Sequence, residues 1–183
     1  LKELKKTYSH KFIWVELGLQ TIHAKTALYI RRGYDLAVFT EAVDTLHTLD
    51  IPFIVHVILG LPGETGEMML KTIDYVNKIS PFGVKLQLLH ILKGTDLATD
   101  FEAGAFQALT EEAYLDILGA CIARLRPDIV LHRVTGDGPK NLLIAPLWST
   151  NKRGVLNHLH QYLKDNQIYQ GKDFHESGTI NTL

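Results

Sequence analysis

A buried strand that leads directly into a glycine-rich turn constrains the fold of this chain more than any other feature. Residues 51–66 read I-P-F-I-V-H-V-I-L-G-L-P-G-E-T-G, an apolar run that ends at Gly60, Pro62, Gly63 and Glu64. Such a run is typical of a strand covered on both faces. Ligands of strand–loop–helix units bind at the carboxyl ends of the strands, where small residues let backbone amides approach. Glycine and proline alone favour a structural turn, so a functional interpretation depends on the neighbouring strands.

The same unit recurs along the chain. Apolar periodicity, capping residues and breakers predict strands at 12–20, 52–60, 83–92 and 128–134, and helices at 24–32, 35–49, 67–79, 110–126 and 152–164. Residues 93–109 are expected to form a loop, and the polar tail 171–183 is expected to be disordered. Strands that alternate with helices predict an α/β fold with neighbouring parallel strands, here an incomplete (β/α) barrel over residues 1–170.

Composition limits the classes of partner. The chain has 183 residues and a formal net charge of −1, which gives no electrostatic case for nucleic acid or an anionic membrane. No apolar run reaches the roughly 18 residues of a membrane span. The single cysteine, Cys121, excludes an internal disulfide and is typical of the reducing cytoplasm, where we expect the protein to be. Because Cys121 lies on an apolar helical stripe, we expect it to be a core residue rather than a nucleophile.

Polar residues interrupt one face of each predicted strand. Side chains alternate along a strand, so Val15, Leu17, Val57 and Leu86 are expected to pack against helices. The opposite, concave face would then carry Glu16, Gln20, His56, Lys85, Gln87 and His132. A buried charge is costly unless it is paired or bound to a ligand, so a shared polar face suggests a functional cavity. A satisfied structural ion pair, such as Glu16 with Lys85, is the alternative.

Three ordered motifs carry a family resemblance. They are W-V-E-L-G-L-Q-T at 14–21, I-L-G-L-P-G-E at 58–64 and V-K-L-Q-L-L-H-I-L-K-G-T at 84–95, followed by H-R-V at 132–134 and L-L-I-A-P-L-W at 142–148. Together they resemble the later half of a radical S-adenosylmethionine (SAM) barrel of the bacterial YhcC-like kind, a family related to elongator-type and coproporphyrinogen-oxidase-type radical enzymes. The resemblance implies the carboxyl-terminal part of a (β/α)6 barrel with a carboxyl-terminal extension.

The resemblance also implies a chemistry and a set of site residues. In the family, a [4Fe–4S] cluster reduces SAM to methionine and a 5′-deoxyadenosyl radical that abstracts hydrogen from a substrate, an iron–sulfur oxidoreductase-like reaction. Glu16 matches the position that contacts the polar part of SAM, the Gly60–Glu64 loop packs near the adenosine, and the segment 90–92 lines the adenine. The implied cofactor-side residues are Glu16, Gln20, His56, Gly60, Pro62, Gly63, Glu64, His90, Ile91 and Leu92. The implied substrate-side residues are Lys85, Gln87, His132 and Arg133.

The chain departs from the family in its cysteine content. The family holds its cluster with three cysteines, which one Cys121 cannot supply. We therefore expect no metal site in this chain, cluster cysteines upstream of Leu1, and a fragment that is inactive alone and binds no cofactor. We also expect the fragment to self-associate as a homodimer through its open side. The catalytic residues and the substrate are not apparent from the sequence.

Two other functions remain open from the residues. One is a cluster-free β/α-barrel enzyme that uses acid–base chemistry, with Glu16 or Glu64 as base and Lys85 or His56 as its partner. The other is a non-catalytic, nucleotide-binding half-barrel.

Overall fold

A four-stranded parallel sheet forms the centre of the protein. The computed structural model describes residues 1–136 and 138–175. The sheet contains β1 (Val15–Gln20), β2 (Phe53–Leu59), β3 (Gly83–Leu88) and β5 (Val130–Arg133), in the spatial order β1-β2-β3-β5. Every neighbouring pair in this sheet is parallel. The predictions of parallel strands in chain order, and of β1 beside β2, are confirmed.

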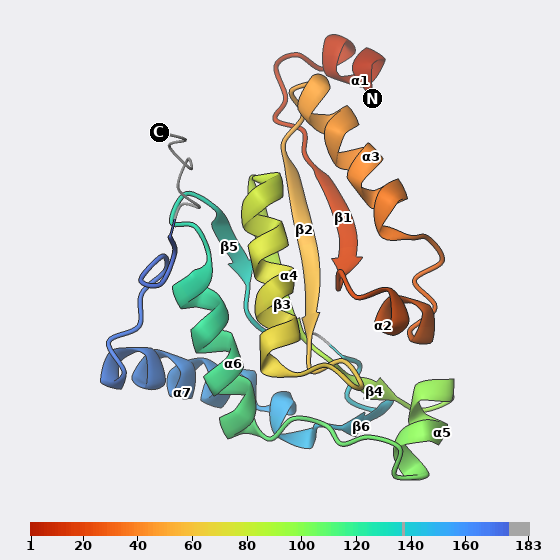
Figure 1. Ribbon diagram of the computed structural model, residues 1–183, viewed down its shortest axis with the longest axis vertical. Helices are drawn as coiled ribbons and strands as arrows, with labels where there is room; N and C mark the ends of the chain where they lie inside the picture. Colours follow the sequence, from red (N-terminus) through yellow and green to blue (C-terminus); the bar gives the residue numbers. More distant parts are fainter. Residues whose placement is uncertain (137, 176–183) are drawn as a thin grey trace, which may run out of the picture.

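Helices connect the strands and cover one face of the sheet (Figure 1). α2 (Ala24–Tyr29) and α3 (Leu36–Thr48) join β1 to β2, α4 (Gly66–Ile79) joins β2 to β3, and α6 (Glu111–Arg124) precedes β5. The side chains of Asp35, Thr65 and Thr110 cap α3, α4 and α6, because each accepts a hydrogen bond from a backbone N–H group in the first turn of its helix. These caps satisfy donors that the first helical turn leaves free.

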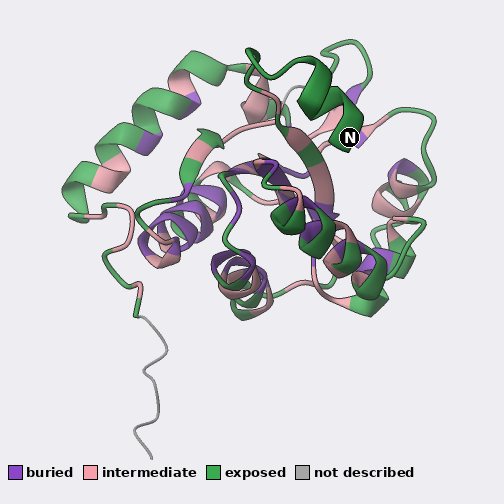
Figure 2. Cartoon of the chain, turned by 90° about the horizontal axis from the view of Figure 1, so that it is seen from above, coloured by how far each residue is buried: buried purple, intermediate pink, exposed green. Residues whose placement is uncertain are grey.

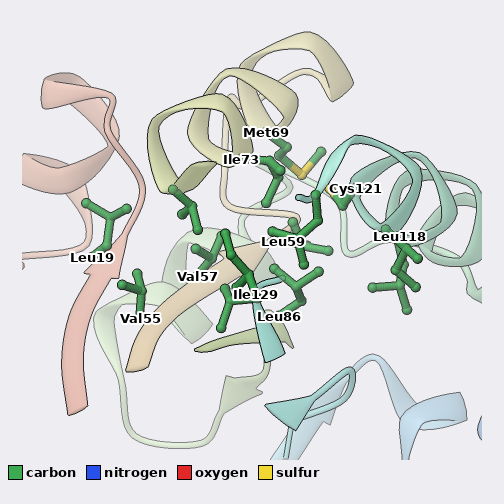
Figure 3. Packing of buried hydrophobic residues seen from close by; sticks show 14 of the residues in the cluster. Leu19, Val55, Val57, Leu59, Met69, Ile73, Leu86, Leu118, Cys121 and Ile129 are labelled. Carbon is green, nitrogen blue, oxygen red and sulfur yellow. The ribbon is translucent and has the colours of Figure 1, made fainter. Parts of the chain in front are cut away.

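The hydrophobic core lies between the sheet and these helices. Figure 2 shows that α3, α4 and α6 turn their buried sides toward the curved sheet. In Figure 3, strand residues such as Val57 and Leu86 meet Ile73 of α4 and Leu118 of α6, all nearly inaccessible to solvent. This burial removes apolar area from water, which is the main favourable term in folding.

A second, smaller sheet begins where the parallel sheet ends. The predicted strand 83–92 is too long: β3 stops at Leu88, and β4 (Ile91–Leu92) pairs antiparallel with β6 (Leu143–Ala145). The last bond to β2 runs from the N–H of Leu89 to the carbonyl of Leu59. Beyond that point β2 has ended and the chain turns into the Gly60 loop. The residues after β3 therefore pair with β6 instead, as strand β4.

The segment predicted as a loop, 93–109, contains a short helix. This is α5 (Asp96–Glu102), which is capped by the side chain of Thr95. After β6, the 3₁₀ helix η1 (Leu147–Thr150) leads into α7 (Lys152–Asp165). In Figure 1, α2, α5, β4 and β6 all lie toward the end of the molecule to which the parallel strands point.

The two ends of the chain also differ from expectation. The first strand begins at Val15 rather than Phe12, and it is preceded by α1 (Lys2–Thr7), which has no buried residue. At the other end, the N–H groups of Gly171 and Asp173 donate to carbonyls of α6, so the predicted disorder is wrong for residues 171–173. The rest of that prediction, at 176–183, lies outside the described residues.

Candidate functional site

Three charged or titratable side chains meet on the open face of the sheet. Glu16 Oε2 lies 2.7 Å from His56 Nε2 and 2.5 Å from Lys85 Nζ. The strand register explains why they meet. His56 pairs with Lys85 on one side and with Gly18 on the other, and Glu16 lies two residues before Gly18, on the same face of β1. Their strand neighbours Leu17, Val57 and Leu86 point into the core, which confirms the predicted assignment of faces.

These contacts settle the charge of Glu16. The hydrogen bond from Lys85, aided by those from His56 and Trp14, lowers the pKa of Glu16 to about 2. Both carboxylate oxygens accept bonds from the chain itself, since Trp14 Nε1 lies 3.5 Å from Oε1. A carboxylate with so low a pKa is a weak base near neutral pH, which argues against acid–base catalysis by Glu16. The Glu16–Lys85 pair, which was the structural alternative to a functional cavity, therefore forms, and it also includes His56.

The Gly60–Glu64 loop is tied to the end of β1. Glu64 Oε1 accepts a 2.5 Å hydrogen bond from Thr21 Oγ1, and Thr21 is fully buried. Gly60 has φ of +84°, and a Cβ there would lie 2.8 Å from Leu109 Cδ1. Gly63 has φ of +77° and open space around it. These contacts give the loop a defined structural role at the carboxyl ends of β1 and β2.

A cavity of about 740 Å³ opens at the carboxyl ends of β1, β2 and β3. Gln20, Ile58, Leu61 and Leu89 line the side of the cavity that the sheet forms. Two segments that are separate in the sequence form the remaining walls, 29–34 and 94–100. Of the predicted site residues, the cavity includes Gln20, while Leu89 occupies the place expected for the segment 90–92.

The walls contain residues that the sequence did not reveal as site residues. They are Tyr29, Arg31, Arg32, Tyr34, Asp96 and Asp100. Asp96 and Asp100 lie in the segment predicted as a loop, where a capping Thr95 followed by the acidic Asp96 was a helical signal. The hydroxyl of Tyr29 donates to Asp100 Oδ2 at 2.5 Å, and Arg31 forms an ion pair with Asp96. The guanidinium of Arg32 donates to the carbonyls of Leu19 and Thr21 and so holds the end of β1.

His90 lies in a different, smaller cavity of about 100 Å³. Its Nε2 is 3.1 Å from Ser149 Oγ, and burial, with a smaller contribution from the charge of Lys152, lowers the pKa of His90. Ile91 is fully buried in the small sheet. None of residues 90–92 lines the larger cavity.

The residues assigned to the substrate side occupy the open face rather than the large cavity. Gln87 is half-buried beside Ile58 in the register of β2 and β3. His132 is exposed, and its ring packs beside the Cα of Gly83 and 5.8 Å from the ring of Phe82. Arg133 is exposed and pairs in register with Lys85.

The chain contains one cysteine, fewer than the three that the resemblance implies for an iron–sulfur cluster. Cys121 is the only cysteine, it is fully buried between α6 and the sheet, and burial raises its pKa to about 12. A thiol in this state is a core residue and not a metal ligand. Among the described residues, no group of three or more histidine, cysteine, aspartate or glutamate side chains could hold a metal ion. Within the same residues, no helix is long and apolar enough to cross a membrane.

Two family profiles match successive parts of this fold. The profile of the radical SAM superfamily matches residues 1–76, and that of the radical SAM C-terminal domain matches residues 81–165. The chain belongs to the radical SAM superfamily. The first profile ends within α4, and the second spans β3, the small sheet, α6 and α7.

Curated relatives place this radical SAM chain with the YhcC-like proteins. The chain is 40% identical over 163 residues to protein YtqA of Bacillus subtilis (strain 168), covering 89% of this chain and 51% of YtqA. It is 34% identical over 156 residues to protein YhcC of Escherichia coli (strain K12), covering 85% of this chain and 50% of YhcC. The radical SAM chain therefore spans about half the length of these relatives.

A solved structure supports the fold independently. The structure of Elp3 from Methanocaldococcus infernus, with residues 1–46 deleted, superposes on this radical SAM chain with a TM-score of 0.77. The match covers 92% of this chain and 40% of the Elp3 chain at 19% sequence identity. At this identity the likeness concerns the fold, and it agrees with the arrangement of parallel strands and helices.

Proposed function

We propose that this chain is the part of a radical SAM enzyme that binds the adenosine portion of SAM. This proposal replaces the expectation that the fragment binds no cofactor, because residues of this chain line a cavity of about 740 Å³. The cavity at the carboxyl ends of β1, β2 and β3 is the single observation that carries the proposal. Its volume of about 740 Å³ lies within the usual range for small-molecule sites, and its position is where parallel α/β units bind ligands.

The residues around the cavity suit a nucleoside. Ile58, Leu61 and Leu89 offer an apolar surface for a flat ring, and Tyr29 and Tyr34 add aromatic area. Gln20, Asp96 and Asp100 provide polar groups that hydrogen-bond to hydroxyls and amines. When bound and reduced by an iron–sulfur cluster, SAM supplies a radical able to abstract hydrogen. The residues of this chain bind and orient SAM, and they exclude water from the cavity.

The Glu16–His56–Lys85 cluster belongs to the same proposal. Glu16 holds the ammonium of Lys85 in place, so the open face presents a fixed ion pair of a carboxylate and an ammonium. We propose that this face orients the substrate, whose chemical class stays open. The oxidoreductase activity is a proposal for the whole protein, and the cluster would bind to residues other than those of this chain. A cytoplasmic location remains a prediction from the cysteine content.

Calorimetric titration with S-adenosylhomocysteine, a stable analogue of SAM, tests the proposal. Leu97 lines the cavity and is only partly buried, so Leu97→Trp would fill the space without disturbing the core. We expect this variant to bind the analogue at least about tenfold more weakly than wild type. Leu28→Trp is the matched control, since Leu28 is 81% exposed and lies outside this cavity.

Circular dichroism checks that both variants fold. Equal binding by Leu97→Trp and wild type, or no binding by either folded protein at millimolar analogue, would contradict the proposed site.

A further inference from the structure

Two segments far apart in the sequence line the cavity and contact each other. Tyr29 and Arg31 lie at the end of α2, whereas Asp96 and Asp100 lie on α5. The Tyr29–Asp100 hydrogen bond and the Arg31–Asp96 ion pair join the two segments at the cavity. The walls of the cavity are therefore connected by polar side-chain contacts at the surface.

These contacts are of a kind that opens easily. The side chains of Arg31 and Asp96 are 79% and 70% exposed, so water competes for both partners and salt screens their attraction. Tyr29 is also exposed. The sheet side of the cavity differs, because Leu59 and Leu61 beneath it are almost completely buried and packed.

α5 is suited to move relative to that rigid side. It has seven residues, of which only Ala98 is buried, and it is flanked by Gly94 and Gly104. Both glycines have φ of +77°, and a Cβ at either position would meet nothing within 4 Å. Neighbouring side chains therefore leave open space beside both glycines, and glycine crosses between backbone regions at little cost. Phe101 and Phe106 pack on each other, within and just after the segment, with ring centroids 5.7 Å apart.

We propose that residues 94–104 form a lid over the cavity, hinged at Gly94 and Gly104 and latched to α2 by the Tyr29–Asp100 and Arg31–Asp96 contacts. The lid opens when both contacts break, and it closes over a ligand that has entered. The identity of the ligand rests on the proposed function, whereas the existence of the lid does not.

Hydrogen–deuterium exchange of the full chain tests the latch without a ligand. The double variant Tyr29→Phe/Asp96→Asn removes one partner from each contact. We expect the amides of 96–102 to exchange about fivefold faster than in wild type, with α4 and α6 unchanged. Glu67→Gln is the control, because it breaks the exposed Glu67–Lys71 pair on α4, away from the lid. Equal exchange of 96–102 in the double variant and wild type would overturn the proposal.

A covalent closure tests gating. In Arg31→Cys/Asp96→Cys, a short bis-maleimide joins the two segments, and the native thiol of Cys121 does not compete because it is buried. We expect the cross-link to slow association of S-adenosylhomocysteine at least about tenfold relative to the same variant capped with N-ethylmaleimide. Equal rates in the two preparations would contradict gating. If no preparation binds the analogue, the proposed function fails, while the exchange result still decides whether the lid exists.

Discussion

Glu16 and Lys85 are 69 positions apart in the sequence, yet Glu16 Oε2 and Lys85 Nζ lie 2.5 Å apart on the open face of the sheet. β2 lies between their strands, and it contributes His56 to the same carboxylate oxygen. The contact thus crosses three neighbouring strands. It makes the polar face one connected unit rather than a set of separate surface charges.

The first prediction concerns the pH dependence of stability. The pKa of Glu16 is about 2 in the folded protein and ordinarily 4.5, so the ionised group stabilises the fold above pH 4.5, and this stabilisation is lost as the pH falls from 4.5 toward 2. In Glu16→Gln this loss is absent. Because Glu16 is partly exposed, we expect the free energy of unfolding to fall by only about 1 kcal/mol more in wild type than in Glu16→Gln as the pH drops from 4.5 toward 2. Urea unfolding at several pH values measures the difference.

Glu41→Gln, at an exposed position of α3, serves as its control. If the free energy of unfolding of Glu16→Gln falls as steeply below pH 4.5 as that of wild type, the pairing contributes nothing to stability.

The second prediction compares two glycines of one loop. Both have positive φ, so alanine is strained at either position, but only at Gly60 would the new Cβ also collide with Leu109. We expect Gly60→Ala to lower the free energy of unfolding by about 2–4 kcal/mol and Gly63→Ala by about 1 kcal/mol. Urea denaturation of both variants checks the order, and equal losses would exclude the collision as the cause.

The third prediction concerns the thiol of Cys121. Because it is fully buried and its pKa is raised to about 12, we expect no reaction with a thiol reagent such as 5,5′-dithiobis(2-nitrobenzoate) until the protein unfolds. Following absorbance at increasing urea concentration should give labelling that coincides with the unfolding transition. Leu28→Cys provides an exposed thiol for comparison. Rapid labelling of the wild-type chain in buffer would refute the core assignment.

The fourth prediction takes up assembly, and we propose that the chain self-associates as a homodimer through its open face. Phe12, Trp14 and Phe82 are 64%, 45% and 40% exposed, and their rings form a row with centroid distances of 5.6 and 5.8 Å. Exposed apolar clusters of this kind, beside an edge strand, favour association. Light scattering at micromolar concentration should report a dimer, and Phe12→Ser/Phe82→Ser should report a monomer.

Tyr169→Ser is the control for that experiment, because Tyr169 is equally exposed but follows α7. A monomeric mass for the wild-type chain would rule out this use of the face.

Local patterns in the sequence were sufficient to predict the parallel sheet and the polar face. The run at 51–66 predicted β2, its turn and α4, because burial on both faces leaves only apolar residues until the chain must bend. Alternation along three strands then placed Glu16, His56 and Lys85 together, since the side-chain period of a strand is two.

Only the tertiary structure decided where β3 ends and what surrounds the cavity. Residues 83–92 read as one strand, but hydrogen bonding continues only while a partner is present, and β2 leaves the sheet after Leu59. The contacts of Tyr29 with Asp100 and of Arg31 with Asp96 are likewise non-local. A sequence pattern records which face a residue prefers within its own element, whereas such contacts depend on how separate elements pack in three dimensions.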